Sequence, residues 1–347
     1  MKKKNLMDLI LLVIFFVLTI LIIIQILKYV KQPADKTYIL IHESIIDNKG
    51  NTVYSSPHNI FYIYDNGNHL ARNVGKVDLY SPKGELIWSK EYRVHHEIEK
   101  GEDNNIYILT RENRTYNEKE VEFDKIVKLS ENGSFIDEWD TFENLDEIQR
   151  LFDSENYTVK YNKRGVFDYF HANSIDYIPK NANDDDPRFQ EGNLIISLSH
   201  VELIVILDKN SKEIVWHWGP GELEFMHTPR MLRNGNIIIF ENGALEPENK
   251  RNYSRIIELD PVKKEIVWEY KADPPESFYS SVKGSVQELP NNNLLVCEAM
   301  AGHVFEIDKN KTIIWETYVY VNSTQKDELY RASYVPKEIV DILLNNN

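Results

Sequence analysis

The chain has 347 residues, which is enough for one large domain or two ordinary ones. Its composition is globular, with 42% apolar and 27% charged residues. The net charge of −15 argues against a nucleic-acid partner, because phosphate binding needs a basic surface. It also argues against broad contact with anionic lipid.

The first predicted element is a membrane anchor. Between Leu9 and Leu27 only Thr19 and Gln25 are polar, and ~20 apolar residues span a bilayer as a helix. We expect a transmembrane helix over about residues 7–28, inside an anchor of residues 1–30. No small-residue cleavage site follows, which favours an uncleaved signal-anchor. The N-terminus would then be cytoplasmic and the body extracytoplasmic, either periplasmic or on the cell surface.

A repeat dominates the body after a short linker at residues 31–36. Its unit is an alternating strand, a turn rich in Asp, Asn, Ser or Gly, and a second strand that carries a tryptophan. The stretch "LIVILDKNSKEIVWHWG", which begins at Leu203, is one example. The tryptophans follow one another at intervals of 51, 77, 52 and 47 residues: Trp88, Trp139, Trp216, Trp268 and Trp315. Periods of about 40–50 residues with four short strands are typical of propeller blades.

Each repeat is preceded by two further predicted strands. The nearer one follows an Asn/Gly turn, as in "NIFYIYDNG" and "GNLIISLS", and the earlier one reads "HHEIEKG", "HANSIDYIP", "HTPRMLR" or "GSVQELP". A sixth blade is expected from both ends of the body. "TYILIHESIIDNKGNTVYS" resembles the last two strands of a blade, and residues 328–336 resemble a first strand. Joining them leaves no free edge. We therefore predict an all-β, six-bladed propeller over residues 37–347, preceded by the transmembrane helix.

Two segments interrupt the repeat. "ENLDEIQRLF" predicts a helical insertion over about residues 143–153. The acidic loop at residues 181–189 is expected to be a solvated loop, because its spacing fits a calcium site poorly. The single cysteine, Cys297, lies in an apolar run and is expected to be a buried, inert thiol.

Three histidines begin first strands in three consecutive blades: His96, His171 and His227. Because these strand starts converge at one end of a propeller's central channel, the three imidazoles are expected to meet there. Imidazole clusters suit metal binding, acid–base work or nucleophilic transfer. Glu97 beside His96 leaves a metal site open as the less favoured alternative.

Other polar residues near these strand starts could bind an anionic oxygen. Arg230 follows His227 by three residues, and His200 ends an inner strand. Donors of this kind stabilise charge that develops in a transition state. The remaining candidate residues for substrate binding are His95, Asn173, Ser199 and Thr228.

With these stretches, from "YILIHESIIDNKGNTVY" to "YRASY", the sequence resembles the bacterial arylsulfotransferase-type propeller family over about residues 37–336. The resemblance implies sulfuryl transfer from an aryl sulfate to a phenol through a sulfohistidine, with no nucleotide sulfate donor and no other cofactor. It implies that His227 is the nucleophile, with support from His96 and His171. One departure is clear. The family has an arginine in an "S-x-R-H" pattern, whereas this chain has Ser199 in "SLSH".

The competing prediction is a non-catalytic propeller that binds a ligand or a protein partner. The departure at Ser199 favours it, because a loose sulfuryl-transfer transition state needs a cation near its oxygens. Fold alone does not settle the matter. A quinone-cofactor propeller fits less well, because a vicinal cysteine pair is missing. The sequence leaves a homodimer open and does not identify the donor or the acceptor.

Overall fold

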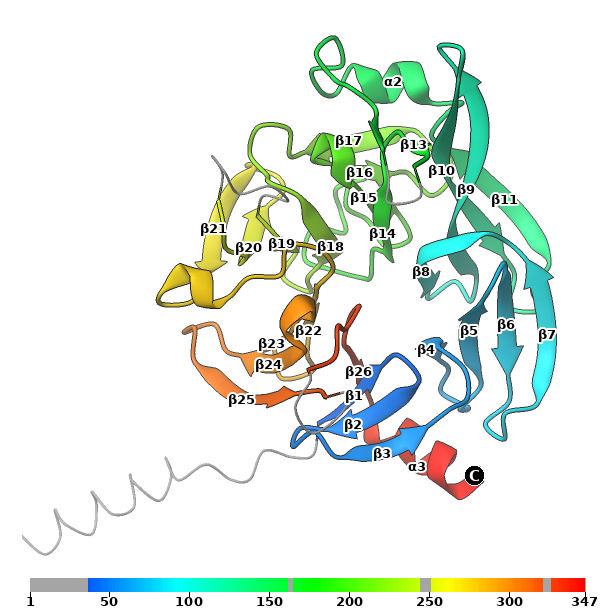
Figure 1. Ribbon diagram of the computed structural model, residues 1–347, viewed down its shortest axis with the longest axis vertical. Coiled ribbons are helices and arrows are strands. Elements are labelled where there is room, and N and C mark those ends of the chain that lie inside the picture. Colours follow the sequence, from blue (N-terminus) through cyan, green and yellow to red (C-terminus); the bar gives the residue numbers. More distant parts are fainter. Residues whose placement is uncertain (1–36, 162–164, 244–250, 321–325, 347) are drawn as a thin grey trace, which may run out of the picture. The chain divides into compact units, whose positions relative to one another are not determined.

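Six antiparallel sheets surround a common centre in the body from Tyr38 to Asn347 (Figure 1). The computed structural model describes residues 37–161, 165–243, 251–320 and 326–346. We number the blades in chain order, starting with the first that is built from one continuous segment. The prediction of an all-β, six-bladed propeller is confirmed.

Blades 1 to 3 follow one another along the chain, and each starts with its innermost strand. Blade 1 consists of β4 (Ile60–Ile63), β5 (His69–Asn73), β6 (Lys76–Tyr80) and β7 (Leu86–Glu91). Blade 2 consists of β8 (Val94–Lys100), β9 (Ile106–Tyr116), β10 (Lys119–Leu129) and β11 (Phe135–Asp140), with β12 (Lys160–Tyr161) and β13 (Phe167–Asp168) added beside β10. Blade 3 consists of β14 (Ala172–Tyr177), β15 (Leu194–Leu198), β16 (Leu203–Leu207) and β17 (Ile214–Trp218).

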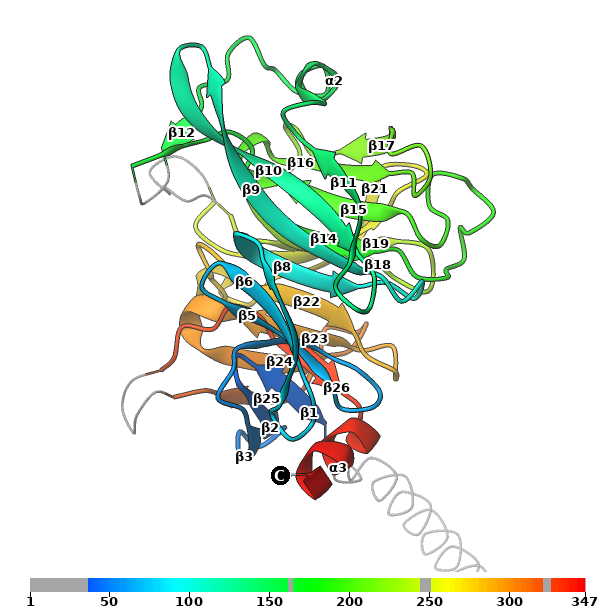
Figure 2. The same cartoon turned by 90° about the vertical axis from the view of Figure 1, so that its right-hand side faces the viewer.

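Blades 4 and 5 repeat the pattern, and blade 6 closes the ring. Blade 4 consists of β18 (Met226–Met231), β19 (Ile237–Glu241), β20 (Arg255–Asp260) and β21 (Glu265–Tyr270). Blade 5 consists of β22 (Ser285–Glu288), β23 (Leu294–Glu298), β24 (His303–Ile307) and β25 (Ile313–Tyr318). In blade 6, β26 (Ser333–Val335) pairs with β1 (Tyr38–Ile41), and β2 (Ser44–Asp47) and β3 (Thr52–Ser55) follow outward. Figure 2 shows the sheets from the side.

Two strand assignments differ from the sequence prediction. "NIFYI" forms β4, the innermost strand of blade 1, rather than a second strand. "TYILIHESIIDNKGNTVYS" supplies three strands of blade 6, not two, so the C-terminal segment adds one strand to them. Both differences arise because Asn/Gly turns follow several strands of a blade, so a turn alone does not identify the strand's position.

The described helices are short. They are α2 (Leu145–Gln149), α3 (Lys337–Asn346) and the 3₁₀ turns η1 (Ser199–Val201), η3 (Pro275–Ser277) and η4 (Ala299–Ala301). Within the described ranges, no helix has the length and apolar character needed to span a bilayer. The anchor expected at about residues 7–28 lies outside the described residues.

The five repeated tryptophans lie in the outermost strands, and three of them join neighbouring blades. The indole Nε1 of Trp88 donates to the Glu131 carbonyl oxygen at 3.1 Å. Trp216 donates in the same way to Pro261 at 2.9 Å, and Trp268 to Lys309 at 3.0 Å. Each acceptor lies in the outer turn of the next blade, so the repeat encodes contacts between blades as well as the outer strand itself.

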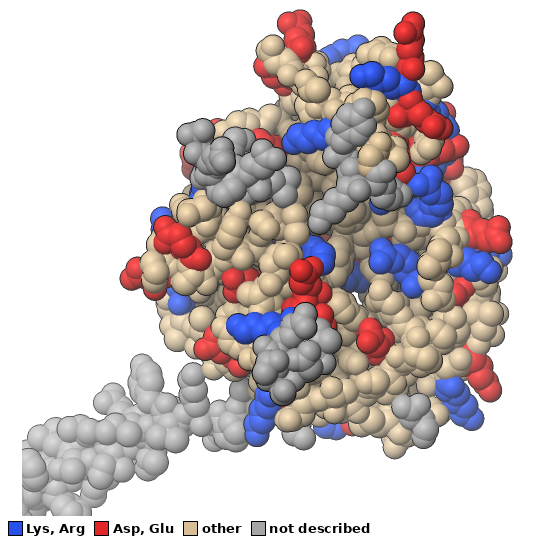
Figure 3. Space-filling view, in the orientation of Figure 1, with Lys and Arg blue, Asp and Glu red and all other residues tan. Residues whose placement is uncertain are grey.

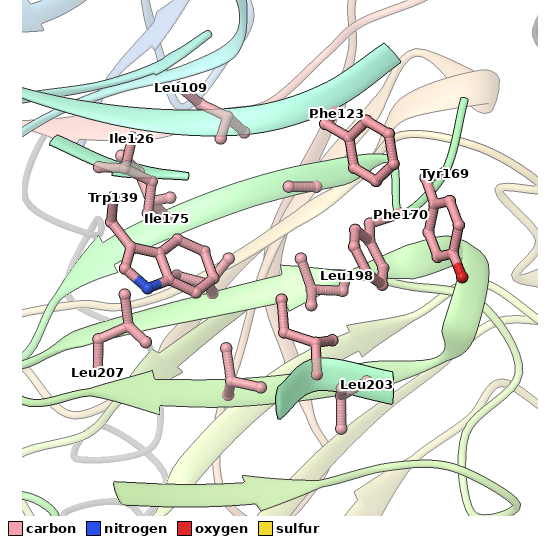
Figure 4. Close-up of a cluster of buried hydrophobic side chains, with 14 of the residues drawn as sticks. Leu109, Phe123, Ile126, Trp139, Tyr169, Phe170, Ile175, Leu198, Leu203 and Leu207 are labelled. Atoms are coloured by element: carbon pink, nitrogen blue, oxygen red, sulfur yellow. The ribbon is translucent and has the colours of Figure 1, made fainter. Parts of the chain in front are cut away.

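Apolar side chains fill the space between adjacent sheets. Between blades 2 and 3, Leu109, Phe123 and Trp139 pack against Ile175 and Leu198, all buried (Figure 4). Because each sheet is covered on both faces, its strands are nearly continuous runs of β-branched and aromatic residues. This packing fixes where each inner strand begins, and the candidate site lies at those strand starts.

Candidate active site

The three histidines lie at irregular starts of inner strands. His96 and His171 have left-handed backbone conformations, with φ of 57° and 50°, and Thr228 beside His227 has φ of 45°. The pairing of β8, β14 and β18 with the next strand shifts register at the same level. A non-glycine residue in this conformation costs about 1 kcal/mol or more, so packing must hold it there.

Four of the histidine rings form a continuous chain of contacts. The ring centroids of His96 and His171 are 4.8 Å apart, in an edge-to-face arrangement. His95 packs against His96 at 5.0 Å, and His200 stacks on His171 at 4.8 Å. The fifth ring, that of His227, lies within electrostatic reach of this chain. Its charge lowers the pKa of His96, and the charge of His171 lowers the pKa of His227. The structure therefore places the three predicted strand-start histidines in one region.

The tautomer of His227 follows from its neighbour Asn242. The Asn242 amide nitrogen donates to the carbonyl oxygens of Ser280 and Lys283, at 2.7 and 2.6 Å, so its oxygen faces the imidazole. His227 Nδ1 lies 2.7 Å from that oxygen and must carry the proton. The lone pair of neutral His227 therefore lies on Nε2.

Hydrogen-bond partners also fix the Nδ1 contacts of His171 and His96. His171 Nδ1 donates to Oδ2 of Asp168 at 2.7 Å. His95 donates from Nε2 to the Thr110 carbonyl oxygen at 3.2 Å, so its Nδ1 accepts from Nδ1 of His96 at 2.7 Å. His96 and His171 are thus held at Nδ1, as His227 is, which leaves Nε2 of these three rings as the nitrogen available to a substrate.

Burial lowers the pKa values of His227 and His96. It is the largest cause of a low His227 pKa, about 4, although the Asn242 hydrogen bond acts in the opposite direction. Burial, together with the neighbouring imidazoles and Arg111, lowers the pKa of His96 far below its ordinary value. Burial raises the pKa of Asp168, but the His171 hydrogen bond and nearby charges outweigh it and bring the value to about 2. At neutral pH, His227 and His96 are therefore neutral, and the Asp168 carboxylate is ionised.

Three of the residues predicted to bind substrate form hydrogen bonds with the backbone of the inner strands. The Ser199 hydroxyl donates to the His171 carbonyl oxygen at 2.6 Å. The Asn173 amide donates to the Met226 carbonyl oxygen at 2.7 Å, which ties blade 3 to blade 4. Thr228 accepts from the Val286 amide at 3.2 Å. These contacts position the histidines.

Arg230 is directed toward a different part of the channel. Its Nε lies 3.5 Å from Oδ1 of Asp176. Arg230, Glu99 and Gln287 line a cavity, and they come from three different inner strands. A register shift separates Arg230 from His227 on β18, and the two side chains have different partners, Asp176 and Asn242.

The described residues offer no matching ligand cluster for a metal site beside His96 or for a calcium site in the acidic loop. No group of three or more His, Cys, Asp or Glu with metal-binding geometry occurs among the residues that the structure describes. Glu97 forms an ion pair with Arg331 instead of facing His96. In the acidic loop, Asp186 pairs with Arg188 at 2.7 Å. Cys297 is fully buried, and burial raises the pKa of its thiol.

Sequence reasoning missed several residues of this region. Asp168 and Asn242, which hold His171 and His227, lie outside the first-strand segments. Arg111 on β9 acts electrostatically on His95 and His96. The Tyr330 ring lies 5.9 Å from that of His96. Arg111 and Asn242 occupy the position that Ser199 has in blade 3, after the second strand's Thr110 and Glu241, but the residue type differs in each blade, so the search for a repeated histidine did not find them.

Fold and site together define a six-bladed propeller with a buried histidine cluster at the starts of its inner strands. The family model of arylsulfotransferase (ASST) matches residues 58–321. The chain therefore belongs to the arylsulfotransferase family, as the sequence resemblance predicted.

Comparison with solved structures shows the fold alone. A protein of unknown function from Bacteroides caccae has a TM-score of 0.54 at 13% identity, covering 87% of this chain and 99% of that chain. The virginiamycin B lyase of Staphylococcus aureus has a TM-score of 0.46 at 12% identity, covering 87% of this chain and 88% of that chain. The curated proteins include no match.

Proposed function

We propose that this protein is a membrane-anchored, extracytoplasmic aryl-sulfate sulfotransferase. It would take a sulfuryl group from an aryl sulfate and pass it to a phenolic acceptor, with His227 as the covalent carrier. The predicted helix over about residues 7–28 would hold it in the membrane with its N-terminus in the cytoplasm. No nucleotide sulfate or other cofactor is required.

The observation that carries the proposal is the state of His227. Its Nδ1 proton is held by Asn242 and its pKa is low, about 4, so the ring is neutral with its lone pair on Nε2. A neutral imidazole with a fixed tautomer is the form that a nitrogen nucleophile needs. A scaffold would have no need for this arrangement.

The chemistry would proceed in two steps. Nε2 of His227 attacks sulfur, an N–S bond forms, the S–O bond to the aryl group breaks, and a phenolate leaves. His171, when protonated with the support of Asp168, would donate from Nε2 to a sulfuryl oxygen or give that proton to the departing phenolate, and the ring centroid of His96 lies 4.8 Å from that of His171. The acceptor phenol then loses its proton to the cluster and its oxygen attacks sulfur, which breaks the N–S bond and restores His227.

The deciding experiment uses the full-length chain in mild detergent with 4-nitrophenyl sulfate. Intact-protein mass is recorded for the wild type and for His227→Ala, together with release of 4-nitrophenol. We expect one sulfuryl adduct on the wild type and none on the variant. A matched control is His69→Ala, since His69 lies on β5 away from the cluster.

A second function, ligand or partner binding without chemistry, is favoured by one feature. Ser199 stands where the family pattern has an arginine, and its hydroxyl is committed to the His171 carbonyl oxygen. If folded wild-type protein shows neither an adduct nor nitrophenol release, the sulfotransferase proposal fails for aryl sulfates. The protein would then be treated as a binding propeller.

A further inference from the structure

Arg72 on β5 is a half-buried cation with no acidic partner. Every other half-buried arginine of the described ranges lies within ion-pair distance of a carboxylate. The contact that Arg72 does make is with the face of Phe61, whose ring centroid lies 5.2 Å from its guanidinium carbon. Burying a charge without a counter-ion is costly, so an unpaired guanidinium in this position calls for an explanation.

A second guanidinium contacts the same ring. Arg331 lies 4.7 Å from the Phe61 centroid and pairs with Glu97. Burial, followed by the charge of Arg72, lowers the pKa of Arg331 to about 10. Burial also lowers the pKa of Arg72, and the charge of Arg111 adds to that effect. Three like charges are thus held near one another with only two of them neutralised by carboxylates, Glu97 and Glu122.

These side chains border a cavity of about 290 Å³. Arg72, Arg331, Lys283 and Tyr330 line it. The acidic residues that border it are Glu43, which is exposed, and Glu328, which lies 3.3 Å from Nζ of Lys283. In Figure 3 the visible face is hollowed near its centre, and both basic and acidic side chains lie around the hollow. The inner part of the cavity therefore favours an anion.

Tyr330 connects this cavity to the histidines. It lines the cavity, and its ring lies 5.9 Å from that of His96. Arg111 acts electrostatically on both His96 and Tyr330. Tyr330 therefore borders both the cavity that Arg72 lines and the histidine cluster.

We propose that Arg72 binds the sulfate group of the aryl sulfate donor, with Tyr330 beside it, and so supplies the positive charge that Ser199 does not. A guanidinium presents its donors in a planar fork that matches two oxygens of a sulfate. The charge comes from blade 1 rather than from blade 3. This inference rests on the proposed function for the identity of the donor, but the anion subsite itself can be tested separately.

The test measures binding of 4-nitrobenzenesulfonate, whose sulfur is bonded to carbon and cannot be transferred. Calorimetric titration compares the full-length wild type with Arg72→Gln, Arg72→Lys and Arg233→Gln. Arg233 is an exposed arginine paired with Glu288 and serves as the matched control. We expect Arg72→Gln to raise Kd at least tenfold, Arg72→Lys to raise it less, and Arg233→Gln to leave it unchanged. Circular dichroism melting confirms that each variant is folded.

The outcomes separate the two proposals. Binding that depends on Arg72, without a sulfuryl adduct from 4-nitrophenyl sulfate, supports the anion subsite and removes the proposed transferase activity. An adduct that forms equally fast in the wild type and in Arg72→Gln keeps the transferase and overturns the subsite. A wild type that does not bind the sulfonate, or a folded Arg72→Gln that binds it as tightly, also overturns the subsite.

Discussion

The Nδ1 atom of His171 lies 2.7 Å from Oδ2 of Asp168, and the carboxylate is almost completely buried. Asp168 belongs to β13, a short strand that joins the edge of blade 2 in parallel to β10. A segment outside the regular four-strand blade therefore orients a histidine of the next blade. Such carboxylate–imidazole pairs fix the tautomer and favour transient protonation of the ring.

Asp168→Asn is expected to slow nitrophenol release from 4-nitrophenyl sulfate by ~10- to 100-fold, because an amide can hold the wrong tautomer of His171. Stopped-flow absorbance measures the rate, and a melting curve confirms folding. Asp186→Asn, in the acidic loop, is the matched control. An unchanged rate in Asp168→Asn would mean that the pair has no part in the transfer.

Adduct formation should persist to unusually low pH. The nucleophile must be neutral, and burial lowers the pKa of His227 to about 4 rather than the ordinary 6.5. The rate is therefore expected to stay nearly flat from pH 8 to 5 and to fall only as the pH drops through about 4. Quenched-flow mass spectrometry across this range measures it. A midpoint near 6.5 would contradict the buried, neutral state of the ring.

A second pH effect concerns stability. Burial, together with the nearby Asp176 carboxylate, raises the pKa of Glu99 to about 8, against a partly opposing Arg230. A carboxyl whose folded-state pKa is raised stabilises the fold below its unfolded pKa, and this contribution is lost as the pH rises through 8. Wild-type protein should lose at least about 1 kcal/mol of unfolding free energy between pH 6.5 and 8.5.

Urea titrations at the two pH values test this loss, with Glu99→Gln as the comparison. The variant carries no titratable group at the position, so its unfolding free energy should change less over the same interval. Equal slopes for the two proteins would show that Glu99 does not carry the proton in the folded state.

The tryptophan repeat allows a matched comparison of stability. Trp216 donates to the Pro261 carbonyl oxygen of the next blade, whereas the buried Nε1 of Trp139 has no partner among the described residues. Trp216→Phe should therefore cost about 1 kcal/mol more unfolding free energy than Trp139→Phe, since only the first loses a hydrogen bond. Chemical unfolding measures both. Equal losses would mean that packing, not the bond, explains the repeat.

The repeat made the fold predictable, because every blade needs the same outer strand with its tryptophan and the same turns. The number of blades and the pairing of the two ends followed from it. Strand order within the first and last blades was less accessible, since Asn/Gly turns occur at several positions in each blade. The helix expected over about 143–153 corresponds to a shorter α2 at Leu145–Gln149.

The candidate site was predictable only where it follows the repeat. His96, His171 and His227 were found because they occupy equal positions in consecutive blades. Arg230 is three residues from His227 in sequence, yet it pairs with Asp176, and the register shift between the two residues was not predictable from the repeat. Arg72 and Asn242 are not repeated from blade to blade. Only the long-range packing of the folded chain brings them to this region.

The pairing of β26 with β1 joins the two ends of the body, with Tyr334 opposite Ile39. During synthesis, β1 emerges first and its inner neighbour emerges last, so the ring cannot close until almost the whole chain is available. Contacts between residues so distant in sequence form slowly. A chain cut short before Ser333 would keep β1 as an open edge, which is a site for aggregation and proteolysis. Finished and unfinished chains thus differ in whether that single strand covers β1.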